Sequence, residues 1–243
     1  MKVVVIGAGI VGSCTALALV KAGCEVVVVE RAQVGGGTTS RGEGNVLVSD
    51  KSPGPELALA LVSVLRWAAL ADEIGADALE FERKGGLVTT ADENALPGLE
   101  ALARSQRRAG VDAEVIDDPR ALEPHLAPEV SRGILYAQDA QVQPVLAAAA
   151  ILAEARRRGV DYRPATEVVS ATRGPDGQIR AVTCQDGTVI ATDAVVNAAG
   201  TWGGQVGSLL GAEIPVLPRK GFILVTEPAP GLVQRKVYSA DYV

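Results

Sequence analysis

Three glycines near the amino terminus and one acid beyond them have the types and spacing of a dinucleotide site. Gly7, Gly9 and Gly12 form the pattern G-x-G-x-x-G, and Glu30 follows it. A glycine turn lets a pyrophosphate approach the backbone, and the next helix offers free N–H groups and a partial positive charge. A carboxylate about 20 residues further on accepts hydrogen bonds from ribose hydroxyls and disfavours a 2′-phosphate. We therefore predict binding of a dinucleotide other than NADP; the alternative is a purely structural turn.

The elements that must position these residues form a βαβ unit. Residues 3–6 are rich in β-branched side chains and predict a buried strand, and residues 25–29 predict a second strand that ends at Glu30. Residues 10–21 predict the helix between them, with Ala22 and Gly23 at its end. In this unit Gly7 permits the tight turn, and Gly12 lets the helix pack close to the first strand.

The segment after this unit helps to choose the dinucleotide. A nicotinamide enzyme continues with further βα repeats, whereas this chain continues with VGGGTTSRGEGNVLVSD. A loop rich in glycine and hydroxyls can wrap a bulky ligand with its backbone amides, and Gly42 and Gly44 allow close approach. The alternative for this segment is a flexible surface loop.

Downstream, the pattern alternates between helices and short strands. Helices are predicted at residues 56–74, 94–110 and 145–158, and strands at 111–116 and 133–137. Hairpins are predicted at residues 79–90 and 168–185, the second with a third strand at 188–191. Residues 194–197 form a buried strand that leads into a glycine-bearing loop, which indicates a return to the nucleotide-binding sheet. The middle of the chain is therefore predicted to be an inserted domain.

Composition narrows the class of protein. The net charge is −6, which argues against nucleic acid or an anionic membrane as the main partner. No apolar stretch is long enough to span a membrane, and we expect a cytoplasmic protein. The cysteines Cys14, Cys24 and Cys184 lack metal-ligand spacing, so no metal is expected and they are interpreted as small buried thiols. His125 is the single histidine, which disfavours hydrolase triads and favours redox chemistry by a bound cofactor.

A resemblance to the D-amino-acid oxidase (DAO) superfamily of FAD-dependent oxidoreductases is carried by three segments: the opening unit, GGGTTSRGEGNVLVSD and VVNAAGTWGG. The stretch TTSRGEGNVLVSDKSPGPEL is similar to the branch with opine oxidase, hydroxyproline dehydrogenase and hydrogen cyanide synthase flavoprotein subunits. The resemblance implies an α/β fold, with a Rossmann-like FAD-binding domain and an inserted α+β substrate domain that is truncated at the carboxyl terminus. The expected bounds are residues 1–80 and 145–214 for the first domain, and 81–144 and 215–243 for the second.

The resemblance also implies which residues hold FAD. The pyrophosphate would lie at the glycine turn, the adenosine ribose at Glu30, the adenine at the Val168 backbone, and the isoalloxazine ring near Gly44 and Asn45. The full set that it implies is Gly7, Gly9, Ile10, Val11, Gly12, Glu30, Arg31, Thr38, Thr39, Ser40, Gly44, Asn45, Val168, Ala199, Gly200 and Trp202.

The activity implied by the resemblance is oxidation of the C–N bond of an amino acid or an opine-like secondary amine, by hydride transfer to flavin N5. No side-chain base is needed, so no catalytic residue is assigned. Relatives continue past Val243 through a carboxylate-binding arginine, and the branch implies electron-accepting subunits and an oligomer. Tyr238 and Tyr242 lie where relatives place a substrate-contacting tyrosine, although an ordinary strand tyrosine is favoured for each. The alternatives are an NAD-dependent dehydrogenase and a truncated, non-catalytic nucleotide-binding module.

Overall fold

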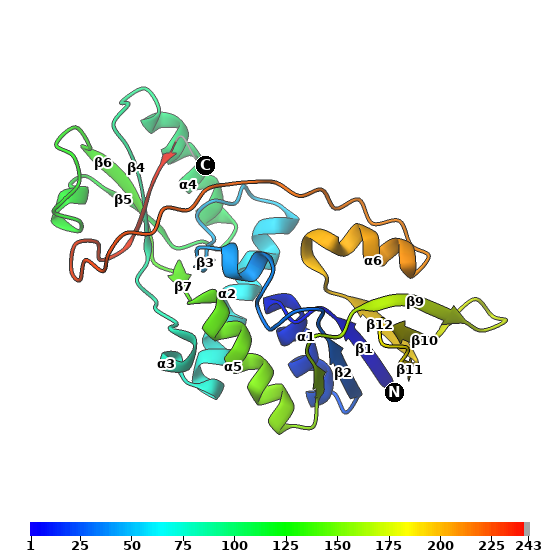
Figure 1. Ribbon diagram of the computed structural model, residues 1–243. Coiled ribbons are helices and arrows are strands. Elements are labelled where there is room, and N and C mark those ends of the chain that lie inside the picture. The colour runs from blue at the N-terminus through cyan, green and yellow to red at the C-terminus, as the bar shows by residue number, and fades with distance from the viewer. Residues whose placement is uncertain (241–243) are drawn as a thin grey trace. The chain divides into compact units, whose positions relative to one another are not determined.

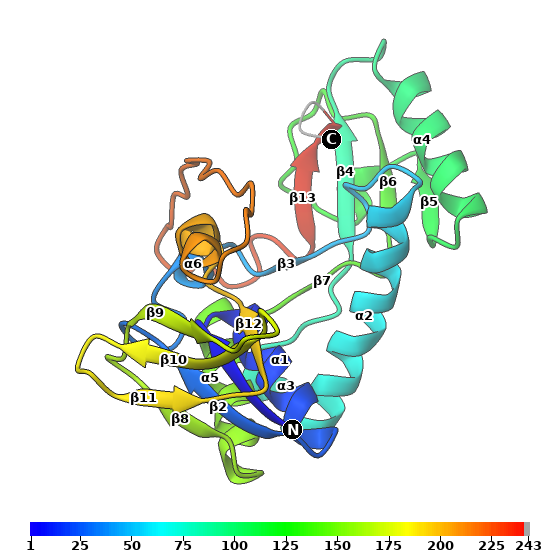
Figure 2. The same ribbon diagram turned by 90° about the vertical axis from the view of Figure 1, so that its right-hand side faces the viewer.

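Residues 1–240 are described by the computed structural model, and they divide into two compact units (Figures 1 and 2). The first unit holds residues 1–43 and 143–223, and the second holds residues 44–142 and the segment that begins at Leu224. The boundary after residue 142 lies close to the expected one after 144. The boundary after residue 43 differs from the expected one after residue 80, because residues 44–80 pack with the second unit.

The first unit contains a parallel sheet, a small antiparallel sheet and helices. Its elements are β1 (Lys2–Ile6), α1 (Ile10–Lys21), β2 (Glu25–Val29), the 3-10 helix η1 (Thr38–Arg41), α5 (Pro144–Arg157), β8 (Asp161–Arg163), β9 (Val168–Arg173), β10 (Ile179–Cys184), β11 (Val189–Ala191), β12 (Ala194–Asn197), the 3-10 helix η3 (Gly200–Trp202) and α6 (Gly203–Leu209).

The parallel sheet of the first unit has the strand order β12-β1-β2-β8. β1 pairs in parallel with both β2 and β12, so that Val4 lies between Val27 and Val195. The predicted βαβ unit is confirmed, with α1 as the crossover between β1 and β2. The prediction that residues 194–197 return to the nucleotide-binding sheet is also confirmed.

Both faces of this sheet are covered, which explains the unbroken apolar runs of β1 and β2. Val4, Ile6, Val27 and Val29 pack against the antiparallel sheet of order β11-β10-β9. The alternate side chains of the same strands are also buried, on the face where α1 packs beside α5 (Figure 1). This packing on both faces fixes the position of the carboxyl ends of β1 and β2 beside the glycine turn.

The second unit contains a mixed sheet with helices. Its elements are β3 (Asn45–Val46), α2 (Pro55–Ile74), α3 (Ala76–Leu79), β4 (Gly86–Thr90), α4 (Leu96–Arg108), β5 (Ala113–Ile116), the 3-10 helix η2 (Pro119–Ala121), β6 (Arg132–Tyr136), β7 (Ala140–Gln141) and β13 (Lys236–Ser239).

The mixed sheet has the order β13-β4-β6-β5 and corrects one prediction about hairpins. The hairpin predicted at residues 79–90 is wrong, because Leu79 ends α3 and β4 pairs with β6. The glycine pair before β4 looks like a turn in the sequence, but Gly86 already belongs to the strand. β13 pairs in parallel with β4, which lies about 150 residues earlier in the chain.

Residues 44–80 belong to the second unit because their apolar side chains join its core. Val48 and Leu57 pack in one cluster with Val88, Ile134 and Tyr136. β3 also pairs with β7 of the same unit. The helical periodicity of residues 56–74 predicts α2 correctly, but it does not reveal which sheet the apolar face covers.

A strained residue lies between β8 and β9. Ala165 has φ of +49°, and its N–H donates to the Ala32 carbonyl at 3.1 Å. We predict that Ala165→Gly raises the free energy of unfolding by about 0.5–1 kcal/mol, because glycine adopts this left-handed conformation without strain. Urea denaturation measures the change. Ala153→Gly, at an exposed position of α5, is the control and should lose about 1 kcal/mol. A lower stability for Ala165→Gly would contradict the prediction.

Within the described residues, no helix has both the length and the apolar character that a membrane crossing needs.

Candidate cofactor site

The glycine turn is packed so closely that side chains do not fit. Gly7 has φ of +108° and donates its N–H to the Val29 carbonyl at 2.8 Å. A Cβ on Gly7 would lie 2.5 Å from the Ala198 carbonyl oxygen, and a Cβ on Gly12 would lie 1.9 Å from the Gly7 carbonyl oxygen. The turn therefore brings β1, β2, α1 and the end of β12 together, which agrees with the predicted roles of Gly7 and Gly12.

The amino terminus of α1 is capped in part by a residue from a distant loop. The N–H of Ile10 donates to Thr39 Oγ1 at 3.0 Å, and a Cβ on Gly9 would lie 2.9 Å from that oxygen. The N–H groups of Val11 and Gly12 donate to no acceptor among residues 1–240. Val11 is 65% exposed, so the first turn of α1 is open to an anion at this point.

Glu30 lies at the edge of the glycine turn, as the sequence predicts. Its Oε2 accepts a hydrogen bond from the Ala8 N–H at 2.9 Å, and its Oε1 accepts one from the Ala32 N–H at 2.9 Å. A carboxylate has about four acceptor positions, so each oxygen can still accept a bond from a hydroxyl. Contact of Glu30 with a ribose remains a prediction.

The loop with Thr38, Thr39 and Ser40 folds against the glycine turn. The Gly35 N–H donates to the Ala8 carbonyl at 2.9 Å, and the Ser40 N–H donates to the Gly35 carbonyl at 3.0 Å. Gly200 has φ of +56°, and a Cβ on it would lie 3.7 Å from Thr38 Oγ1. Segments more than 150 residues apart thus meet beside one turn, and the flexible-loop alternative is disfavoured.

Trp202 and Arg31 contact each other in the same region. The guanidinium carbon of Arg31 lies 3.9 Å from the centroid of the Trp202 ring. A Cβ on Gly37 would lie 3.2 Å from the edge of that ring. Two of the predicted site residues are therefore in direct contact.

Asn197 is a site residue that sequence reasoning missed. Its Nδ2 donates to the Gly203 carbonyl at 2.8 Å, and its Oδ1 accepts from the Ala199 N–H at 3.2 Å. These bonds shape the loop that carries Ala199, Gly200 and Trp202. The available signal was its position, since an asparagine at the end of a strand commonly bonds to the backbone that follows.

Two predicted residues belong to the second unit, and their place near a flavin ring remains a prediction. Gly44 accepts a hydrogen bond from the Val142 N–H at 2.9 Å, and Asn45 pairs with Gln141. The Oδ1 of Asn45 accepts a hydrogen bond from the ammonium group of Lys236.

Val168 lies in the core of the first unit, and its contact with an adenine also remains a prediction. It begins β9, is 6% exposed and packs with the apolar side chains of β1 and β2. The nearby Thr166 N–H donates to the Glu30 carbonyl at 2.9 Å, which places this segment alongside the end of β2.

Tyr238 is engaged within the second unit. Its hydroxyl hydrogen-bonds to Ser49 Oγ, which donates to the buried carboxylate of Asp139. Burial, and then the charge of Asp139, raise the pKa of Tyr238. This contact favours the interpretation of Tyr238 as a strand residue with a structural role. Tyr242 lies outside the described residues.

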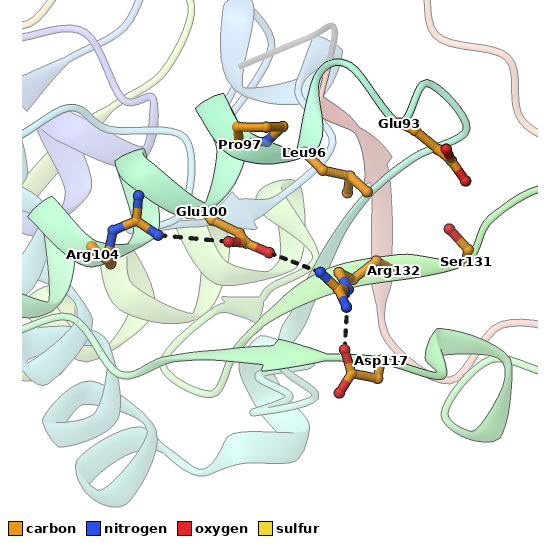
Figure 3. Close-up of a pocket in the computed structure, with 8 residues that line it drawn as sticks. All are labelled: Glu93, Leu96, Pro97, Glu100, Arg104, Asp117, Ser131 and Arg132. Atoms are coloured by element: carbon orange, nitrogen blue, oxygen red, sulfur yellow. Dashed lines mark hydrogen bonds and ion pairs between the residues drawn. The ribbon is translucent and has the colours of Figure 1, made fainter.

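A shallow hollow of about 600 Å³ also lies in the second unit (Figure 3). Figure 3 shows Glu100 between Arg104 and Arg132, with Arg132 also reaching Asp117. Both arginines are thus paired with acids from the same wall, at 3.0–3.6 Å. The hollow is an ion-pair patch of the second unit, whereas the glycine turn belongs to the first.

The cysteines differ in exposure, which corrects the expectation that all three are buried. Cys184 is buried, whereas Cys14 and Cys24 are half-buried, and all three thiols are free. Burial raises the pKa of the Cys14 thiol, on α1, to about 11. Its thiolate fraction at pH 8 is therefore very small.

We predict that iodoacetamide alkylates Cys14 at pH 8 on the order of a hundredfold more slowly than free cysteine, because the thiolate is the nucleophile. The rate should rise with pH up to about 11, the pKa of the thiol. Mass spectrometry of the peptide that contains Cys14 measures the rate. A rate at pH 8 equal to that of free cysteine would contradict the prediction.

The comparison with known families identifies the dinucleotide. A family model described as DAO, FAD dependent oxidoreductase, matches residues 2–242. The chain belongs to this family of FAD-dependent oxidoreductases. FAD is the cofactor of the family, and the α/β, Rossmann-like fold of the first unit agrees with it.

Among relatives, the chain is 30% identical over 245 residues to the anaerobic glycerol-3-phosphate dehydrogenase subunit A1 of Haloferax volcanii, with 92% of this chain and 40% of that protein covered. It is 29% identical over 249 residues to a glycine oxidase of Geobacillus kaustophilus, with 98% and 65% covered. The solved L-proline dehydrogenase of P. horikoshii has a TM-score of 0.84 at 25% identity, with 99% and 64% covered. The chain thus spans 40% to 65% of the length of these proteins.

One observation in the structure itself indicates that the residues of the first unit suit FAD. The two N–H groups of Val11 and Gly12 that have no acceptor within residues 1–240 lie at the helix terminus beside Gly9. Such paired donors at a helix amino terminus suit the pyrophosphate of a dinucleotide.

Proposed function

We propose that the protein containing this chain oxidises the C–N bond of an amino acid or an opine-like secondary amine. FAD, held by the residues of the first unit, would supply the hydride acceptor for this oxidation. The observation that supports a role in such chemistry is the convergence, within the first unit, of the glycine turn, Glu30, the loop with Thr38–Ser40 and the loop with Gly200. The amine class is supported by the similarity to a glycine oxidase and to an L-proline dehydrogenase.

In this proposal the residues of the first unit bind the cofactor and fix its position. Val11 and Gly12 donate their N–H groups to the pyrophosphate, and Glu30 accepts hydrogen bonds from ribose hydroxyls. Thr38, Thr39 and Ser40 lie beside the phosphates and ribityl chain, and the Val168 backbone meets the adenine. Arg31 has no acidic partner among residues 1–240, so its charge is available to the phosphates.

We further propose that the second unit is the substrate domain, with Gly44 and Asn45 near the ring. The substrate domain would have to hold the reacting Cα–H in the orientation that hydride transfer to the flavin needs. The substrate amine must be neutral, so that its lone pair forms the C=N bond as the hydride leaves with both electrons. Water then hydrolyses the imine to a carbonyl and an amine or ammonia. The protein supplies orientation and exclusion of bulk water.

A second candidate function is oxidation of an alcohol. The observation that favours it is the similarity to a glycerol-3-phosphate dehydrogenase subunit, which covers 92% of this chain. In that case a secondary hydroxyl would replace the amine at the reacting carbon. We also propose that electrons pass to a partner subunit, which is supported by the similarity to a dehydrogenase subunit.

Dye reduction by the purified protein, loaded with FAD, tests these proposals. Glycine, proline, sarcosine and an opine are compared with glycerol 3-phosphate under anaerobic conditions. We expect reduction with at least one amine and formation of its carbonyl product. Reduction with glycerol 3-phosphate alone would move the assignment to the second candidate, and binding of NAD in preference to FAD would contradict both.

Val11→Pro directly tests the proposed hydrogen bond from the Val11 N–H to the pyrophosphate of FAD. Proline removes the N–H of Val11 but is tolerated in the first turn of a helix, and α4 of this chain carries Pro97 there. We predict that the variant binds FAD about tenfold to a hundredfold more weakly, since it loses one hydrogen bond to a charged group. Flavin fluorescence measures the affinity. Val11→Ala keeps the N–H and is the matched control. Equal affinities for the two variants would contradict the prediction.

A further inference from the structure

The Trp202 ring lies against two other segments of the first unit. Its face carries the guanidinium of Arg31, whose carbon is 3.9 Å from the ring centroid. The edge of the ring lies beside Gly37, where an added Cβ would be 3.2 Å from the nearest ring carbon. Arg31 follows β2, Gly37 precedes η1, and Trp202 ends η3. The Trp202 side chain therefore contacts two nearby positions, Arg31 and Gly37, that lie more than 160 residues earlier in the sequence.

We infer that Trp202 is a positioning residue of the cofactor site, which acts by holding Arg31 and the loop from Gly37 to Arg41 in place. This inference rests on the proposed function, because it concerns the site that would hold FAD. This role does not require contact between Trp202 and the cofactor.

The geometry of an arginine explains why stacking suits this role. A guanidinium is planar, and its five N–H donors point outward in the plane. Stacking on the indole occupies the face and leaves the donors on the edge available to an anion. Arg31 is exposed, and no acceptor among residues 1–240 hydrogen-bonds to its side chain. The ring thus fixes the orientation of an arginine without using its hydrogen-bonding groups.

The contact at Gly37 ties the same ring to the loop with the threonines. Thr39 Oγ1 accepts from the Ile10 N–H, so this loop is bonded to the amino terminus of α1. A ring that presses on Gly37 limits how far the loop can move from that terminus. Loss of the ring would free the loop and Arg31 together, and binding of FAD would then have to restore their order.

The experiment measures FAD affinity by flavin fluorescence in the full chain. Trp67, on α2 of the second unit, is the other of two tryptophans, so a Trp67→Phe background makes Trp202 the single emitter. In that background we compare Trp202→Phe, Trp202→Leu, Arg31→Gln and the double variant Arg31→Gln with Trp202→Leu. Melting of the unliganded protein is recorded for each.

We expect Trp202→Leu to weaken FAD binding by about 5- to 30-fold, because leucine has no face on which a cation can stack. Trp202→Phe should stay within about threefold of the parent, since it keeps an aromatic face. The double variant should bind FAD clearly more tightly than the product of the two single effects predicts, because both changes break the same contact. Arg31→Gln should shift the emission of Trp202 in the unliganded protein.

Three results would overturn the inference. They are FAD binding by Trp202→Leu within twofold of the parent, equal losses for Trp202→Phe and Trp202→Leu, or full additivity of the Arg31 and Trp202 changes. If Trp202→Leu does not fold, Arg31→Gln decides through its emission shift and affinity, because Arg31 is exposed. If the parent itself binds no FAD, the proposed function fails, while an unchanged emission in Arg31→Gln would refute the contact separately.

Discussion

Gly12→Ala is expected to abolish FAD binding and to lower the free energy of unfolding by about 3 kcal/mol. The added Cβ would lie 1.9 Å from the carbonyl oxygen and 2.9 Å from the carbonyl carbon of Gly7. Both atoms are backbone, so they cannot rotate away as a flexible side chain can. Either α1 moves from β1 or the turn deforms, and each change disrupts the N–H groups proposed to hold the pyrophosphate.

Urea denaturation followed by the emission of Trp202, in a Trp67→Phe background, reports this change for the first unit. Gly98→Ala, on α4 of the second unit, is the control and is followed by the emission of Trp67 in a Trp202→Phe background; no neighbouring side chain or segment lies within 4 Å of a Cβ at that position. The control should gain about 0.5–1 kcal/mol, the usual advantage of alanine over glycine inside a helix. A wild-type denaturation midpoint and FAD affinity for Gly12→Ala would refute the close packing.

Asp139→Ala is expected to destabilise the second unit by about 3–5 kcal/mol, because it leaves several buried donors without an acceptor. Asp139 is fully buried, and its Oδ1 accepts from the Val48 N–H at 2.8 Å. Its Oδ2 accepts from Ser49 Oγ, which also bonds to Tyr238. Asp139→Asn keeps one carbonyl oxygen and should cost less. Equal losses of stability for Asp139→Ala and Asp139→Asn would contradict the prediction, because only the asparagine keeps an acceptor oxygen.

The same carboxyl predicts a pH dependence with a definite sign. Burial raises the pKa of Asp139, only partly offset by its hydrogen bonds to Ser49 and Val48. The folded state therefore keeps this proton to a higher pH than the unfolded state, whose aspartate has a pKa of about 3.9. The stability due to Asp139 is fully present below that pH and falls as pH rises through the folded pKa.

Asp139→Asn removes this titration, so the stability of the wild type relative to Asp139→Asn should fall between about pH 4 and the folded pKa. Urea denaturation at a series of pH values, with the emission of Trp67 as the reporter in a Trp202→Phe background, measures the difference. A difference that grows with rising pH would contradict the raised pKa.

The opening βαβ unit shows how much of the fold could be predicted from local pattern. Its two strands and its helix coincide with predicted residues to within one position, because β-branched runs and helix formers act over short range. The glycines were informative for the same reason: their spacing reports the shape of a single turn.

The prediction of a hairpin at residues 79–90 failed because a glycine pair before a strand resembles a turn. The antiparallel partner of β4 is β6, more than 40 residues later.

The sequence by itself determined the glycine turn of the dinucleotide site, the family and the order of the main elements. Each of these depends on neighbours along the chain or on a recognisable run of residues. Only the tertiary structure decided that α2 packs in the second unit, that Trp202 stacks on Arg31, and that Tyr238 bonds to Ser49 beside Asp139. These are contacts between residues about 30 to 190 positions apart. No periodicity or motif records such a contact, because the energy that forms it comes from burial and pairing in the folded state.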